Sequence, residues 1–197
     1  MSSVSGGAYA ISASANPLVA PVAVGALPSV TLPAEGGGPF AETLVSANLV
    51  GLAPFGVARV STEGNSGRGS ATSSATILDA SVAGVLTAGA IRSRCSARTG
   101  DAEGTAAVAD LVVGGVPIAT VHAGPNTEIT LPAGRVILNE QEPYGNSGVV
   151  VNAVRVTLDS LPFVGDVVLG QSRCAVNTTS TRSRARALRR AHRRHTS

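Results

Sequence analysis

The chain has 197 residues and contains no lysine and no tryptophan, and only 3% of its residues are aromatic. Without lysine, no glycine-rich loop here can act as the lysine-bearing phosphate cradle of nucleotide-binding proteins. With few aromatic rings, the core must be built from Val, Ala, Ile and Leu, which pack as thin layers and favour stacked sheets. The 23 Gly and 11 Pro residues disfavour long uninterrupted helices.

Acidic residues are absent from the end of the chain, since all 12 lie at or before Asp166. Eight arginines accompany them, so this part carries a net charge of about −4. The other seven arginines lie in the tail: Arg182, Arg184, Arg186, Arg189, Arg190, Arg193 and Arg194. We expect residues 177–197 to be disordered in isolation and to bind polyanions in a salt-dependent way. The tail lacks stacking aromatic residues and a recognition element, so specific nucleic-acid binding is not expected.

The chain contains two cysteines, Cys95 and Cys174. Strand alternation places Cys95 on an inward face with Ile91, and Cys174 on an inward face with Val168 and Val176. Two inward cysteines on separate strands favour a disulfide, worth about 4 kcal/mol in the chain-entropy model, and suggest a secreted domain. The alternative is a pair of buried thiols in a cytosolic protein.

The start of the chain lacks an export signal, because no basic residue precedes Arg59. We expect that a leader was removed or was lost at a mis-assigned start; the alternative is a cytosolic chain. The apolar stretch 18–32 is interrupted by Pro21 and Pro28 and is too short to cross a bilayer, so no transmembrane segment is expected.

Three strand-like segments end the body of the chain, at residues 135–142, 149–158 and 165–174. Strict alternation in the second segment predicts one face made of Val150, Asn152, Val154, Val156 and Leu158. The same rule near the start places Tyr9 on one side of a strand with Ile11.

Turn signals divide the rest of the chain into short strands. Gly114-Gly115 between two apolar runs predicts a tight hairpin, and residues 71–86 fit either a helix or a strand pair, of which we favour the strands. The total is ten or more short strands with no βαβ alternation. We therefore predict a disordered segment at residues 1–7 and an antiparallel, all-β sandwich domain at residues 8–176.

Few residues have a pattern that suggests chemistry. Glu140 and Glu142 share one face of an extended segment and could act as acid and base in a carbohydrate-active hydrolase, or form a solvated strand end. His122 lacks a nucleophile motif around it, and Asp101 and Glu103 lack the spacing of a calcium loop. The two cysteines are too far apart in sequence for a zinc motif. No catalytic residue, metal or other cofactor is expected.

Three sequence blocks carry a family resemblance: Val136-Ile-Leu-Asn-Glu-Gln141, Val151-Asn-Ala-Val-Arg-Val-Thr-Leu158 and Gly165-Asp-Val-Val-Leu-Gly-Gln-Ser-Arg-Cys174. Through them the chain resembles the choice-of-anchor P family of exported, mostly actinobacterial surface proteins, whose C-terminal anchoring device varies among members. The resemblance covers about residues 8–176 and is strongest in the last third. It implies export and a surface location, and it implies no catalytic activity.

These observations predict a non-enzymatic, extracellular or cell-surface domain, associated with the cell wall and acting in structure or interaction. The expected partners are a cell-wall polymer or another surface protein. One alternative is a polyanion or nucleic-acid binder that acts through the tail arginines. The other is the hydrolase that would use Glu140 and Glu142.

Overall fold

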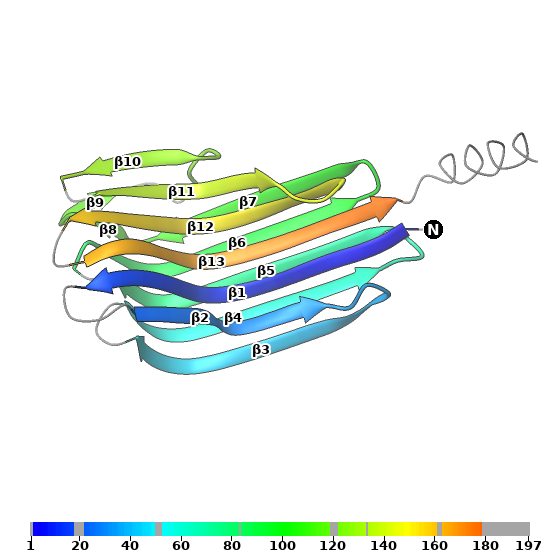
Figure 1. Cartoon of the computed structure of the whole chain (residues 1–197), viewed down its shortest axis with the longest axis horizontal. Coiled ribbons are helices and arrows are strands. Elements are labelled where there is room, and N and C mark those ends of the chain that lie inside the picture. The colour runs from blue at the N-terminus through cyan, green and yellow to red at the C-terminus, as the bar shows by residue number, and fades with distance from the viewer. Residues whose placement is uncertain are drawn as a thin grey trace, which may run out of the picture.

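A computed structural model describes residues 2–17, 22–49, 53–82, 84–118, 122–132, 134–160 and 163–178. These residues form two antiparallel sheets stacked face to face, with no helix among them. Figure 1 shows the two layers, and β1 and β13 of one sheet pack against β5 of the other. The predicted all-β sandwich is confirmed, and an aliphatic core lies between the layers.

The six-stranded sheet contains the end and the start of the described chain. Its spatial order is β10 (Thr127–Leu131), β11 (Gly134–Pro143), β12 (Ser147–Ser160), β13 (Phe163–Thr178), β1 (Ser2–Pro17) and β2 (Val22–Leu32). The three segments predicted near the end of the chain are confirmed as β11, β12 and β13. Proline-containing β2 lies at the sheet edge, where a missing N–H donor is tolerated.

The seven-stranded sheet contains the middle of the chain. Its order is β3 (Gly36–Leu49), β4 (Ala53–Asn65), β5 (Ser70–Val82), β6 (Leu86–Arg98), β8 (Leu111–Val113) and β9 (Val116–Ile118), with β7 (Asp101–Ala109) also paired to β6. The stretch at residues 71–86, which fitted either a helix or strands, contributes to β5 and to the start of β6, so the strands favoured from the sequence are confirmed. Gly114 and Gly115 close the predicted β8–β9 hairpin, and their φ values of 58° and 80° are those that such a tight turn requires. A short turn at residues 99–100 leads from β6 into β7, which begins at Asp101.

The prediction that residues 1–7 are disordered is wrong. Ser2 to Pro17 pair with β13 along its whole length, starting with Ser2 opposite Thr178, and Val4 is buried in the core. A Ser- and Gly-rich start is typical of a flexible end, but hydrogen bonds to a strand far away in the sequence order it. The chain therefore enters and leaves the described sandwich side by side, as Figure 1 shows. The disorder expected from residue 177 is wrong for Asn177 and Thr178, which still pair with β1 as the end of β13. The rest of the tail lies outside the described residues.

In each sheet the inward–outward alternation of side chains is interrupted at aligned positions on neighbouring strands. We call this interruption the phase change. In the six-stranded sheet, two consecutive residues face the core on each of four neighbouring strands: Leu138/Asn139, Ala153/Val154, Leu169/Gly170 and Ala10/Ile11. Asn139 and Gly170 have positive φ values, of 52° and 67°, at these positions. In the seven-stranded sheet the doubled residues face outward instead, as with Leu78 and Asp79.

This phase change corrects three predicted faces. In β12, Asn152 shares the outer face with Arg155, whereas Val151, Ala153 and Val154 all face the core. In β13, Leu169 faces the core and Val168 lies on the outer face, opposite to the side predicted for Val168. In β1, Ile11 faces the core, whereas Tyr9, predicted on the same side, lies on the outer face. Simple alternation fails because two consecutive residues face the core on each of these strands, which reverses the sides of all residues beyond them.

Candidate functional site

The two cysteines join the sheets through the core. Cys95 of β6 and Cys174 of β13 form a disulfide with a Cα–Cα distance of 6.0 Å, across a sequence separation of 79 residues. Both residues are buried, and Ile91 lies on the same inward face of β6 as Cys95, as predicted. The disulfide favoured by the sequence is therefore confirmed, and it covalently fixes the β13 layer to the β6 layer.

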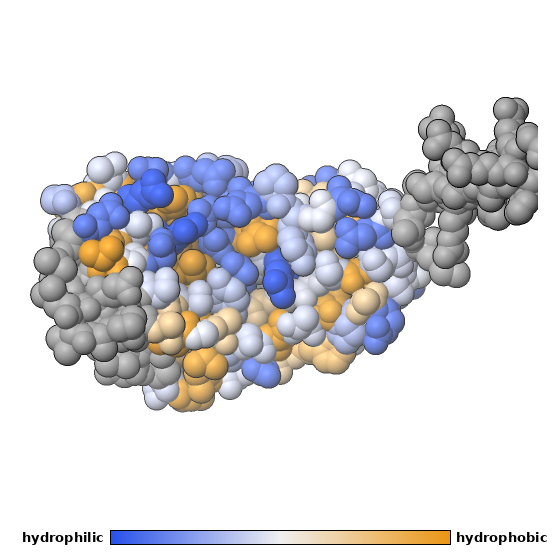
Figure 2. Space-filling model, in the orientation of Figure 1, coloured by the Kyte–Doolittle hydropathy of each residue, from blue (hydrophilic) through white to orange (hydrophobic). Residues whose placement is uncertain are grey.

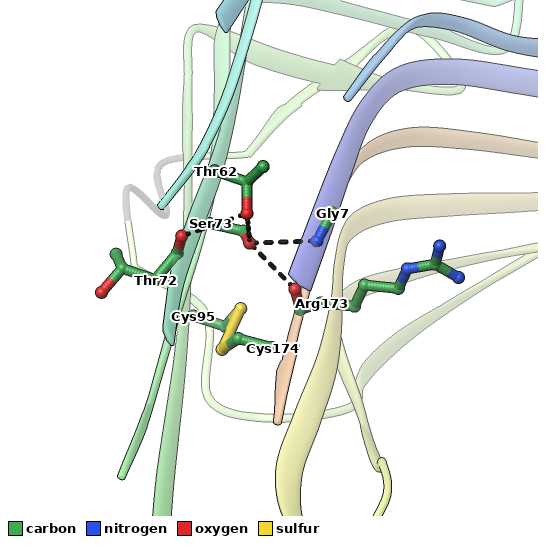
Figure 3. The surroundings of a disulfide bond; sticks show 7 residues. All are labelled: Gly7, Thr62, Thr72, Ser73, Cys95, Arg173 and Cys174. Carbon is green, nitrogen blue, oxygen red and sulfur yellow. Dashed lines mark hydrogen bonds between the residues drawn. A yellow bond between two sulfur atoms is a disulfide. The ribbon is translucent and has the colours of Figure 1, made fainter. Parts of the chain in front are cut away.

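A buried serine links the same layers by hydrogen bonds (Figure 3). The Ser73 hydroxyl donates to the carbonyl oxygen of Arg173 at 2.9 Å and accepts from the Gly7 N–H at 3.2 Å. It also shares a hydrogen bond of 2.8 Å with the Thr62 hydroxyl. Because a buried hydroxyl without partners is costly, this arrangement matches one polar group of β5 to the backbones of β1 and β13.

The outer face of the six-stranded sheet carries a connected polar network. Asn152 donates to Oε2 of Glu140 at 2.6 Å and accepts from Nε2 of Gln171 at 2.8 Å. The same Gln171 nitrogen donates to the Tyr9 hydroxyl at 2.9 Å. Arg155 completes the network with ion pairs to Oε1 of Glu140, at 3.2 Å, and to Asp166, at 3.1 Å. Figure 2 shows this face, where hydrophilic side chains gather over β10 to β13.

The network is partly withdrawn from solvent, which affects two pKa values. Burial raises the pKa of Tyr9 above its usual value, against opposing effects from the Ser12 hydrogen bond and the charge of Arg173. Burial disfavours the charge of Arg155, but the hydrogen bond and charge of Asp166 together with the charge of Glu140 hold its pKa above the usual value. Arg155 is thus held as a cation between two acids.

Glu140 and Glu142 lie on one outer face of β11, as predicted, but in different environments. Both carboxylate oxygens of Glu140 accept hydrogen bonds, and the residue is 8% exposed, whereas Glu142 is exposed. A carboxylate held by Asn152 and Arg155 forms part of a polar network and is poorly placed to receive a substrate proton. The hydrolase remains a sequence-based hypothesis, without a feature of this face that favours it.

The remaining sequence candidates do not come together as a reactive cluster. His122 is exposed and borders a hollow that is lined by Ser74 and Thr105 and by no carboxylate. Asp101 and Glu103 lie on the outer face of β7. Within the described ranges, no three His, Cys, Asp or Glu side chains are grouped so that they could hold a metal ion.

The outer face of the seven-stranded sheet is organised in rows that cross the strands. One row contains Thr43, Arg59, Thr76, Arg92 and Ala107 from β3 to β7. The next contains Ala41, Ser61, Ser74, Arg94 and Thr105. We call these two rows the arginine band. An apolar row that includes Val57 and Leu78 borders it on one side, and a row with Glu63 and Glu103 borders it on the other.

Two hollows lie on the arginine band. One, of about 270 Å³, is lined by Thr76, Arg92 and Arg94 among others. The other, of about 220 Å³, lies where the band borders the Glu63 row and is lined by Ser61, Arg94 and Glu63 among others. Arg94 therefore stands at both hollows. Arg59, Arg92 and Arg94 are exposed, and in the described part of the chain the ion pairs involve only Arg155. This band was not predicted from the sequence, although the i, i+2 spacing of Arg92 and Arg94 in a strand pattern is a visible signal of it.

A third hollow, of about 370 Å³, lies nearer the β4–β5 turn. Its lining includes Glu63 and Arg68, so charges of both signs meet there. The seven tail arginines predicted to bind polyanions, Arg182 to Arg194, lie outside the described residues.

Comparison with known proteins found no family model, no curated protein and no solved structure that matches this chain.

Proposed function

We propose that this protein is a non-enzymatic, exported domain that acts in structure or interaction at the cell surface or cell wall. The observation that carries the proposal is the disulfide between Cys95 and Cys174. Disulfides persist in oxidising compartments and are rare in the reducing cytosol. The part of the chain that the structure describes also contains no helix that is long and apolar enough to cross a membrane.

The sequence blocks in β11, β12 and β13 support the same proposal through their resemblance to the choice-of-anchor P family. All three strands contribute to the outer-face network: Glu140 of β11 pairs with Arg155 of β12, which also pairs with Asp166 of β13. Side chains that hold one another in this way suit a rigid scaffold better than a reactive centre. The partner we propose is a cell-wall polymer or another surface protein.

The test is the redox state and location of the protein in its native host. Cells are lysed in an alkylating agent, and the surface and cytosolic fractions are analysed by mass spectrometry without reduction. We expect the peptides of Cys95 and Cys174 to be linked, and the protein to be found in the surface fraction. Alkylated, unlinked cysteines in the cytosolic fraction would contradict the proposal. A sample reduced before alkylation serves as the control for both peptides.

A further inference from the structure

We propose that the arginine band on the outer face of the seven-stranded sheet binds an acidic polysaccharide. The band is independent of the tail arginines and of the cellular location proposed above. Three observations carry it: three arginines without a described ion-pair partner, rows of hydroxyls between them, and two hollows that meet at Arg94.

The spacing of the arginines suits a linear partner with repeated negative groups. Arg59 and Arg92 are in the same row and two strands apart, which corresponds to about 10 Å. Arg92 and Arg94 are two residues apart on one face of β6, which corresponds to about 7 Å. An arginine binds oxyanions through a planar fork of donors, so three of them can hold successive acidic groups.

The other residues of the band indicate what the partner must offer. Ser61, Ser74, Thr76 and Thr105 present hydroxyls, which both donate and accept hydrogen bonds and so match the hydroxyls of a sugar chain. Neither row contains an aromatic residue. Nucleic-acid bases are bound in single strands by stacking on aromatic rings, so this surface fits a single-stranded nucleic acid less well.

The acidic neighbours limit the site to the two rows. Glu63 and Glu103 lie one row away, and Glu63 also borders the smaller hollow at Arg94. On the other side, Asp79 and Asp110 lie beyond the apolar row. A polyanion that extended along the strands would meet these carboxylates. One that runs across the strands, from β4 to β7, follows the arginines and avoids them.

The experiment measures binding of the full chain to dextran sulfate, with unsulfated dextran as the matched neutral polymer. All seven tail arginines are first replaced by glutamine, so that the tail cannot supply the binding. In that background Arg59→Gln, Arg92→Gln and Arg94→Gln are introduced together. The control for this band variant has three exposed arginines outside the band replaced by glutamine, Arg68, Arg98 and Arg135, so that the same charge is removed.

We expect the tail-neutralised chain to bind dextran sulfate and not dextran. The band variant should lose at least about tenfold in affinity, since it loses the charges that contact the ligand, while the control variant stays within about twofold. Circular dichroism and the unfolding midpoint verify that both variants remain folded. The proposal is overturned if the tail-neutralised chain does not bind, or if the two variants behave alike. It is also overturned if a single-stranded oligonucleotide binds the band as tightly as dextran sulfate does. The purified protein is used throughout, so the result does not depend on whether the protein is exported.

Discussion

The two outer faces of the sandwich carry similar types of residues but differ in how these residues are paired. On the six-stranded sheet, Arg155 lies between two acids, and the amides of Asn152 and Gln171 connect Glu140 to Tyr9. On the seven-stranded sheet, Arg92 and Arg94 are exposed, and their row neighbours are the small residues Thr76, Ala107, Ser74 and Thr105. Both faces are polar, but in the described part of the chain the ion pairs lie on the first face, while the second groups three arginines that are in no ion pair.

The difference follows from side-chain length and from which residues lie opposite each other. Long Glu, Gln and Arg side chains on adjacent strands can reach one another and exclude water from the network. Serine and threonine beside an arginine are too short to cover it, so the guanidinium stays in solvent and hollows form next to it. A polar sheet face is therefore better judged by its unpaired groups than by its composition.

The largest expected effect comes from cutting the covalent link between the sheets that carry the two faces. Replacing Cys95 and Cys174 by alanine should lower the free energy of unfolding by about 4 kcal/mol, because the bond closes a loop of 79 residues. Denaturant unfolding of the variant, compared with the oxidised wild type, measures the loss. A change below about 1 kcal/mol would show that the two layers hold together without the bond.

Removing the centre of the closed network should cost more than removing a comparable group from the open face. Asn152→Ala leaves Oε2 of Glu140 without its donor and removes one of the two acceptors of Gln171, so the free energy of unfolding should fall by about 1–3 kcal/mol. Ser74→Ala on the other face removes one hydrogen bond, to Ser61, and should change it by less than about 0.5 kcal/mol. Equal losses in denaturant titrations would contradict the contrast between the faces.

The phase change at Gly170 brings the network residues to the outer face, so a side chain there should be harmful. Gly170→Ala should cost about 1–2 kcal/mol, because φ is 67° and the new Cβ would lie 3.3 Å from both Ala153 and Ile91. Gly25→Ala is the matched control, since a Cβ there meets no atom within 4 Å. Thermal and denaturant unfolding of both variants measure the difference. If Gly170→Ala left the free energy of unfolding unchanged, the backbone at the phase change could relax to accept a side chain.

The buried phenol of Tyr9 should make the closed face sensitive to alkaline pH. Because its folded pKa is raised, the neutral phenol contributes stability below the ordinary pKa of about 10, and this is lost as the pH rises through the folded pKa. Tyr9→Phe should weaken the loss of stability above pH 10. The chain has two tyrosines, so an ultraviolet titration of Tyr144→Phe reports on Tyr9 alone. Ionisation below the usual pKa would contradict the burial of this side chain.

The smallest expected effect is on the open face. The triple variant Arg59→Gln, Arg92→Gln and Arg94→Gln should keep the free energy of unfolding within about 0.5 kcal/mol of the wild type, because none of the three is in an ion pair of the described chain. A loss near 2 kcal/mol in denaturant titrations would mean that these arginines stabilise the sheet and are not held ready for a ligand.

Local patterns were sufficient to predict the strands, the Gly114–Gly115 hairpin and the pairing of two inward cysteines. They failed where a long-range contact or the phase change between strands was decisive. Strand β1 was expected to begin after residue 7, because its partner β13 is far away in sequence. The outward position of Asn152 was obscured by the phase change at Ala153, and with it the network around Glu140.

Aliphatic, glycine-rich alternation by itself determined that this chain forms layered strands, because burial of one face requires a period of two. Only the tertiary structure decided which strands are neighbours, which residues share a row, and where the phase reverses. Those decisions placed Arg155 between acids and left Arg94 beside hydroxyls. The physical reason is that the pairing of a charge depends on which side chains the folded strands bring within reach, and strand order is set by the packing of the whole sandwich.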